Sequence, residues 1–406
     1  MHEENRMDRR QFVTRTAGTL GAAAAASLVG LPGAAAAGGS KSASGGGALG
    51  LVGCDHVGIT VPDINQAIEW FEDVLGARAP LTFGPLEAGP FVASVVDVSK
   101  KTAIDQITML RIGHSANIEL FKYTAPTGQR HDMPKNSDWS GHHVAFYVKD
   151  MAAAVEYMKG KAVTRMPGGP FTLTEGPAAG QTIQYFRTPW GGYIEFISYP
   201  DGMAYEAEAE QPLWSPKMNG KDSVVTKVPG LLGIDHIGIT VPDIGAAAKW
   251  LETKLGFVNP LTFGPFSDPT GNFMKELVDV NPRAVAEQIR VLRNGNGPNV
   301  ELFQYSAPGQ DRRFRRNSDW GGHHIAFYVR DIDKGVKQLQ KRAGHKLFGP
   351  VKLTEGPAAG QEINYFENPF GTDVELISYP KGMAYEKKAA VDLWNPLDNK
   401  AGGRGG

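Results

Sequence analysis

Repetition along the chain is the feature that most restricts its fold. The nine residues from Leu173 to Gln181 recur unchanged from Leu353 to Gln361, 180 residues later. A fixed offset of this length indicates a duplicated structural unit. The sequence therefore predicts a first domain at residues 51–206, a linker at 207–230, a second domain at 231–386 and a tail at 387–406.

A weaker repeat lies inside each half. Asp55 to Asp63 can be laid over His142 to Asp150, and in both segments a histidine precedes the closing aspartate by seven residues. Each half is therefore itself doubled. The chain is predicted to contain four modules, which open at His56, His143, His236 and His324.

Each module begins with residues whose polarity alternates. In the first module Val57 and Ile59 point to one face of the expected strand, and His56 and Gly58 point to the other. An aspartate then caps a helix with one apolar side, which a glycine ends. Short β-branched and aromatic segments follow, separated by Gly/Pro turns. A module of one strand, one helix and about three strands indicates an α+β fold.

The first 37 residues have the features of an export signal. Arg9-Arg10 is a twin-arginine pair, and an uncharged Ala/Gly/Leu stretch follows it. The stretch is short and Ala-rich for a membrane span, so we expect cleavage before Gly38 and no stable membrane insertion afterwards. Residues 38–50 are then a flexible tether. The mature protein is predicted to be periplasmic or extracellular.

Composition excludes several classes of protein. The 42 Lys+Arg and 43 Asp+Glu residues nearly balance, which argues against a nucleic-acid binder. The single cysteine, Cys54, rules out a disulfide framework within the chain and a cysteine-based zinc site. The basic loop around Arg313 and Arg315 is expected to be solvated, with the steering of an anionic substrate as the alternative.

Histidines and glutamates recur in a pattern that suggests metal binding. Six of the ten histidines are shared between the halves, and each half has two glutamates within apolar strands, where an unpaired charge is costly. One histidine and one glutamate come from each module. The candidate ligands are His56, Glu119, His143, Glu195, His236, Glu301, His324 and Glu375.

Two imidazoles and two carboxylates suit a divalent ion of Fe, Mn, Co, Ni or Zn, with up to two ions per chain. The alternative is a structural role, in which histidines are hydrogen-bonded and glutamates are paired with Arg or Lys. The recurrence of the quartet favours metal. The module overlay selects His143 rather than His142, so His142 and His323 are expected to support ligands or anchor loops. The small Gly58 and Ala145 are expected to leave room above the sheet for a bound ligand.

These motifs resemble the vicinal oxygen chelate superfamily, which includes glyoxalase I, methylmalonyl-CoA epimerase, type I extradiol dioxygenases and bleomycin-resistance proteins. The resemblance rests on Asp55 to Val61, on Gly141 to Val148, on the glutamates and on their second-half copies. It implies that two βαβββ modules pair into a curled mixed sheet around a divalent metal. It also implies one ligand set in each half, although the sequence does not decide whether the halves exchange ligands.

The resemblance implies a small-molecule substrate that chelates the metal through two neighbouring oxygens. Four protein ligands are typical of the lyases and isomerases of the family, in which Glu119, Glu195, Glu301 or Glu375 could act as a catalytic base. Two alternatives stay open. One is an Fe(II)-dependent extradiol dioxygenase, and the other is a binding or resistance protein without catalysis. The sequence also leaves homo-oligomer formation open.

Overall fold

The computed structural model describes residues 49–218, 226–343 and 347–398. The predicted export signal lies outside the described residues, as does the tether except for Leu49 and Gly50. Leu49 is buried in the core. Within the described ranges, no helix combines the length and apolar character that crossing a membrane requires.

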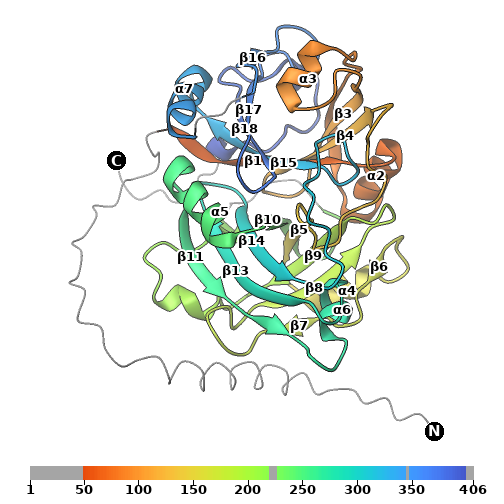
Figure 1. The fold of residues 1–406 in the computed structure, drawn as a ribbon, viewed down its shortest axis with the longest axis vertical. Helices are drawn as coiled ribbons and strands as arrows, with labels where there is room; N and C mark the ends of the chain where they lie inside the picture. The colour runs from red at the N-terminus through yellow and green to blue at the C-terminus, as the bar shows by residue number, and fades with distance from the viewer. Residues whose placement is uncertain (1–48, 219–225, 344–346, 399–406) are drawn as a thin grey trace.

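The first module, red to orange in Figure 1, follows the predicted order with one added helix. Asp63 caps its first helix by accepting a hydrogen bond from the backbone N–H of Gln66, and Gly76 ends the helix in a left-handed conformation, as predicted. The last turn is a π-helix, which the sequence did not indicate. The elements are β1 (Leu51–Thr60), α2 (Ile64–Trp70), the π-helix η1 (Phe71–Leu75), β2 (Arg78–Phe83), α3 (Pro90–Val96), β3 (Ala103–Arg111) and β4 (Asn117–Thr124).

The third module repeats this order together with the added helix, whereas the second and fourth have no helix at that position among their described residues. The second contains β5 (His142–Val148), α4 (Met151–Tyr157), β6 (Thr164–Arg165), β7 (Phe171–Thr172), β8 (Thr182–Arg187) and β9 (Tyr193–Ser198), then η2 (Ala204–Ala207) and η3 (Pro216–Met218). The third contains β10 (Leu231–Thr240), α5 (Ile244–Trp250), η4 (Leu251–Leu255), β11 (Val258–Phe263), β12 (Phe266–Ser267), α6 (Phe273–Val278), β13 (Val285–Arg293) and β14 (Asn299–Ser306). The fourth contains β15 (His323–Val329), α7 (Ile332–Ala343), β16 (Val351–Lys352), β17 (Glu362–Phe366) and β18 (Asp373–Ser378), then η5 (Ala384–Lys387) and η6 (Pro396–Asp398).

The modules pair across the two halves of the chain. One sheet has the order β16-β17-β18-β15-β1-β4-β3-β2 and joins the fourth module to the first. The other has the order β11-β13-β14-β10-β5-β9-β8-β6 and joins the third module to the second. Figure 1 shows this pairing, with the orange and blue modules together and the yellow and green modules together. The predicted α+β class with curled mixed sheets is confirmed.

One face of each sheet supplies the main core. Val57 and Ile59 of β1 are buried in the same cluster as Ile237 and Ile239 of β10, so the two sheets share this core. Cys54 is buried in it as well, as expected for a structural residue. The alternate residues of β1 and β10 point to the opposite faces of the sheets, where the histidines lie.

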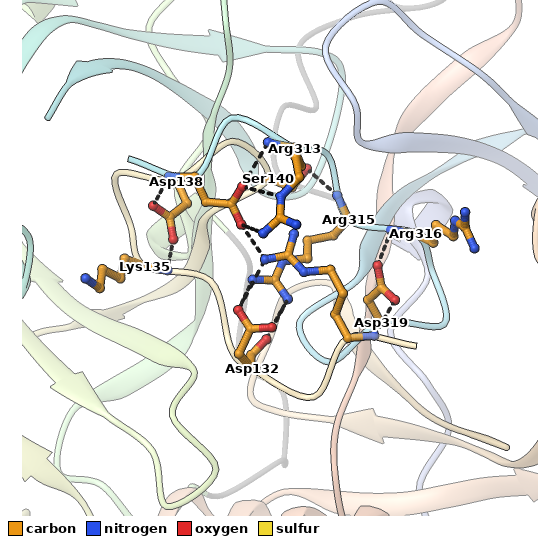
Figure 2. Close-up of polar contacts among 10 residues, drawn as sticks. Asp132, Lys135, Asp138, Ser140, Arg313, Arg315, Arg316 and Asp319 are labelled. Carbon is orange, nitrogen blue, oxygen red and sulfur yellow. Dashed lines mark hydrogen bonds and ion pairs between the residues drawn. The ribbon is translucent and has the colours of Figure 1, made fainter. Parts of the chain in front are cut away.

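Two equivalent loops, residues 129–141 and 310–322, hold the halves together, and we call them the loop clasp. The backbone N–H of Trp139 donates to the carbonyl of Asp311 at 2.9 Å, and that of Trp320 donates to the carbonyl of Arg130 at 3.0 Å. Figure 2 shows Arg315 reaching across the clasp to Asp132, at 2.7 Å. The Arg315 side chain is only 1% exposed, so the expectation of a solvated loop is wrong for this residue.

Arg130 and Asp311 occupy equivalent positions of the clasp and form an ion pair with each other. Replacing Asp311 by Arg should lower the free energy of unfolding by about 2 to 3 kcal/mol, because it removes a charge-assisted hydrogen bond and puts two cations together. The double variant Arg130→Asp/Asp311→Arg should recover part of this loss. Urea denaturation would measure both effects.

The exposed pair Lys159 and Glu156 provides the control, since its side chains are 63% and 69% exposed. Glu156→Gln should change the free energy of unfolding by less than about 1 kcal/mol. Equal stability of the two single variants would contradict a structural role for the Arg130–Asp311 pair.

Candidate metal centres

The sheet register brings two histidines and two glutamates together from both halves of the chain. Gly58 of β1 lies between His324 of β15 and Glu119 of β4 in one row across the strands. Ala326 of β15 lies between His56 and Glu375 in the other row. Because a small residue separates the two ligand candidates in each row, all four long side chains can converge above the sheet. We call this group centre 1: His56, Glu119, His324 and Glu375.

The donor atoms of centre 1 are close enough to bind a single ion. The Nε2 atom of His56 lies 3.2 Å from Glu119 Oε2 and 3.3 Å from Glu375 Oε2. The corresponding distances from His324 Nε2 are 3.3 and 3.1 Å. Adjacent ligands about 2.1 Å from one ion are expected to lie about 3.0 to 3.4 Å apart. The four residues therefore fit a divalent ion without rearrangement.

Centre 2 repeats the arrangement on the other sheet. Its members are His143, Glu195, His236 and Glu301. In both centres the imidazole Nε2 atoms of the two histidines are 3.3 Å apart. The four donor atoms of each centre lie within 4.8 Å of one another, and all eight residues are buried.

These positions correct two expectations from the sequence. Each centre takes one histidine and one glutamate from each half, so the grouping of His56 and Glu119 with His143 and Glu195 is wrong. The space above Gly58 is not open for a ligand either, because a Cβ atom there would lie 1.9 Å from Cε1 of His324. The glycine makes room for the imidazole of the other half. Gly238 does the same for His143.

Buried acidic and phenolic groups orient one histidine of each centre, which the sequence analysis missed. Asp55 Oδ1 lies 2.8 Å from His56 Nδ1, and the hydroxyl of Tyr379 donates to Asp55 Oδ2 at 2.5 Å. Asp235, His236 and Tyr199 form the same chain in centre 2. A carboxylate on Nδ1 leaves the Nε2 lone pair facing the centre. An Asp-His pair occurs at the same position in both halves, as Asp55-His56 and Asp235-His236. This repeat was the sequence signal that could have identified the supporting aspartates.

The carboxylates of centre 1 face the two imidazoles. The buried Oε2 atoms of Glu119 and Glu375 each lie 3.1 to 3.3 Å from the Nε2 atoms of His56 and His324. Tyr365 lies next to them, with its hydroxyl 3.3 Å from His324 Nε2. Two buried carboxylates that share the same two imidazoles need positive charge between them, and a bound cation would supply it.

A cavity of about 480 Å³ opens directly onto centre 1. Glu119 and Glu375 form part of its lining, and Glu355 borders it from the loop that follows β16. Its other walls include residues of β2, α3, β3, β4, β16 and β17. A volume of this size is typical of sites for small organic molecules.

The family model for the glyoxalase/bleomycin resistance protein/dioxygenase superfamily matches residues 55–183 and 235–365. The two matches together cover more than half of the chain. The chain belongs to this superfamily. Each match covers one module and most of the next, and each includes three of the eight candidate ligands. Glu195 and Glu375 lie just beyond the matched residues.

One curated protein and one solved structure are among those similar to the chain. A 2-epi-5-epi-valiolone epimerase from an Actinomyces species is 43% identical over 179 residues, which cover 44% of this chain and 97% of that protein. Among solved structures, glyoxalase I from Zea mays is 16% identical, with a TM-score of 0.48 over 80% of this chain and 92% of the other. The family match and the epimerase relative support the prediction of an enzyme.

Burial and neighbouring charges shift the pKa values of the centre 1 residues in opposite directions. Burial disfavours the charged imidazole of His56, but Glu119 and Asp55 outweigh it and raise the His56 pKa well above its ordinary value. Burial also disfavours the Glu375 carboxylate, but His324 and His56 lower its pKa to about 2. The pKa values in centre 2 shift in the same directions. Without metal, these shifts favour the protonated imidazoles and the ionised carboxylates.

Metal binding should consequently release protons, up to two for each ion, because a bound imidazole must be neutral. Because the imidazole pKa values are raised, protons compete with the metal for the histidine nitrogens. The affinity for metal should therefore increase as the pH rises, until the histidines of the metal-free protein are neutral. Calorimetric titration of the metal-free protein with Zn²⁺ in two buffers of different ionisation enthalpy would count the protons. A binding enthalpy that is independent of the buffer would contradict this protonation state.

His142 and His323 lie outside both ligand sets. Their rings contact each other with centroids 4.2 Å apart, at the junction of the second and fourth modules. The Nε2 atom of His323 lies 3.0 Å from the hydroxyl of Thr372. Burial lowers the pKa of His142 to about 4, so this pair is neutral at physiological pH. The contact joins the strands that carry His143 and His324.

Proposed function

We propose that this protein is a metal-dependent isomerase that moves a proton at a carbon atom next to a carbonyl group. Its substrate is a small molecule with two neighbouring oxygen atoms. The observation that carries the proposal is centre 1, where two imidazoles and two carboxylates converge at the base of a cavity of about 480 Å³. The 43% identity to an epimerase supports this reaction type.

A divalent ion of Fe, Mn, Co, Ni or Zn would supply the positive charge that acidifies a carbon-bound proton beside a carbonyl. The chain supplies the groups that move the proton. Glu119 on β4 and Glu375 on β18 both line the cavity, and β15 and β1 separate their strands. One carboxylate can accept the proton from one side of the substrate carbon while the other returns a proton to the opposite side. Such an exchange inverts the configuration at that carbon.

The test is proton exchange with solvent in the absence of oxygen. The protein loaded with Mn²⁺, Co²⁺, Ni²⁺ or Zn²⁺ would be incubated in D₂O with α-hydroxy ketones, keto sugars, 2-epi-5-epi-valiolone, hemithioacetals and catechols. We expect deuterium at the carbon next to the carbonyl of one substrate class, detected by NMR, and loss of this exchange in the Glu375→Gln variant. Fe(II)-dependent oxygen consumption with ring cleavage of a catechol would instead identify a dioxygenase.

We also propose export through the twin-arginine pathway, on the basis of Arg9-Arg10 and the uncharged stretch that follows. Because this pathway carries folded proteins, both centres would acquire metal before export. Replacing both arginines by lysine should retain the precursor in the cytoplasm. Immunoblotting of cell fractions would measure this, and undiminished mature protein outside the cytoplasm would contradict it.

A further inference from the structure

The space beside the two centres differs greatly, although their ligands are equivalent. The cavity at centre 1 encloses about 480 Å³, whereas the cavity at centre 2 encloses about 60 Å³. A cavity of roughly 150 Å³ is needed to hold a molecule as large as benzene. Centre 2 therefore has room for a few water molecules and not for an organic substrate.

Four substitutions between the repeats contribute to the smaller space beside centre 2. At these positions the lining of centre 2 has the larger side chain, and of the remaining lining positions only Ala286 is smaller than its counterpart, Ile104. The pairs, with the residue of centre 1 first, are Leu86 and Phe266, Val92 and Met274, Val95 and Leu277, and Val351 and Phe171.

Aromatic contacts close centre 2 and leave centre 1 open. Phe171 of β7 is buried and packs edge-on against Phe273 of α6, with ring centroids 5.0 Å apart. At centre 1 the counterpart of Phe171 is Val351. The counterpart of Phe273 is Phe91, which is 52% exposed and lies 6.1 Å from the exposed ring of Phe348. Phe91 therefore lies in the wall of the centre 1 cavity without filling it, and Phe348 packs against Phe91.

The walls of the open cavity are mainly apolar. Val92, Val95 and Ile107 line it on the side of the first module, and Leu353 and Ile363 line it on the side of the fourth. The carboxylates of centre 1 lie at its base. A substrate that carried hydroxyl groups at every position would lose hydrogen bonds with water against these walls. The lining instead suits a molecule with two oxygens at one end and an apolar body.

We propose that substrate binds and reacts only at centre 1, that this substrate carries an apolar group beside its two chelating oxygens, and that centre 2 holds its metal without binding substrate. This proposal rests on the proposed function, because it assigns that function to one of two metal centres. The chain thus has one reactive and one structural centre within a duplicated fold.

Calorimetric titration with a chelating probe tests this assignment without an activity assay. The probe is hexanohydroxamic acid, which offers two neighbouring oxygens and an apolar chain, and the protein is the full chain loaded with Ni²⁺. The wild-type protein should hold two ions but bind one probe molecule. Acetohydroxamic acid should bind at least about tenfold more weakly, because it lacks the methylene groups that the apolar walls would cover.

Two exchange variants provide matched controls. The filled variant gives centre 1 the side chains of centre 2, through Leu86→Phe, Val92→Met, Val95→Leu and Val351→Phe. The opened variant makes the reverse changes at centre 2, through Phe171→Val, Phe266→Leu, Met274→Val and Leu277→Val. With two ions bound in each, the filled variant should bind the probe at least about tenfold more weakly than the wild-type chain, because the larger side chains narrow its apolar cavity. The opened variant should bind two molecules.

Two probe molecules on the wild-type chain, or undiminished probe affinity of a folded filled variant, would overturn the assignment. If the filled variant does not fold, the opened variant decides, since binding of a single probe there would also overturn it. A wild-type chain that binds no metal would refute the proposed function together with this inference. Two ions with two probes would refute this inference alone.

Discussion

Replacing His324 by Ala should reduce the metal content of the chain from two ions to one. His324 belongs to the second half, yet its Nε2 atom lies 3.3 Å from Glu119 Oε2 of the first half. The loss should therefore empty centre 1 and leave centre 2 loaded. The rate of the proposed isomerisation should fall by about 10³-fold or more, since a bound ion typically contributes several kcal/mol to the transition state. Elemental analysis and solvent-exchange rates would measure the two effects.

The adjacent His323 offers a matched control. It is equally buried, but it contacts His142 and Thr372 and belongs to neither ligand set. His323→Asn should keep two ions. If His324→Ala also retains two ions, His324 is not a ligand, and if it loses both, the two centres are not independent.

The second large effect is expected from Gly58→Ala, although this change adds only one methyl group. The new Cβ atom would lie 1.9 Å from Cε1 of His324, so the buried imidazole must move away from the centre. Overpacking of this kind costs about 1 to 3 kcal/mol of stability. We expect centre 1 to bind metal at least about tenfold more weakly, because displaced ligands lose much of their affinity.

Two other glycines show whether the effect is specific. Gly238→Ala should weaken centre 2 instead, because Gly238 faces His143 at the same distance. Gly89→Ala should affect neither centre, since no atom lies within 4 Å of the Cβ position there. Calorimetric metal titration would compare the three variants. Equal effects of Gly58→Ala and Gly89→Ala would show that the space above Gly58 does not position His324.

The sequence predicted the modules and the candidate ligands because both depend on local patterns. Asp63 and Gly76 mark the ends of the first helix through their own backbone preferences. Glu119 and Glu375 could be recognised because carboxylates are rare within apolar strands. These signals do not depend on which module pairs with which.

The pairing of modules could not be predicted in the same way. β1 pairs with β15 of the other half. The sequence of β5 is almost the same as that of β15, so the sequence alone would equally allow β1 to pair with β5. One signal of pairing was present in the clasp, where the equivalent positions carry Arg130 and Asp311. Opposite charges at equivalent positions favour contact between unlike halves over contact between two copies of one half.

The difference between the two cavities was also visible in the sequence, but only after the fold is known. Val92 and Met274 are both apolar, and each fits the buried side of a short helix. Their difference in volume acquires meaning because both side chains face a cavity beside a metal centre. Such conservative substitutions carry no functional signal on their own.

The most direct test of the account is an anomalous diffraction map of crystals of the Ni²⁺-loaded chain, recorded at the nickel edge. The account predicts two peaks per chain. One should lie among His56, Glu119, His324 and Glu375, and the other among His143, Glu195, His236 and Glu301. Peaks that join ligands of a single half, or the absence of a peak at both positions, would contradict it.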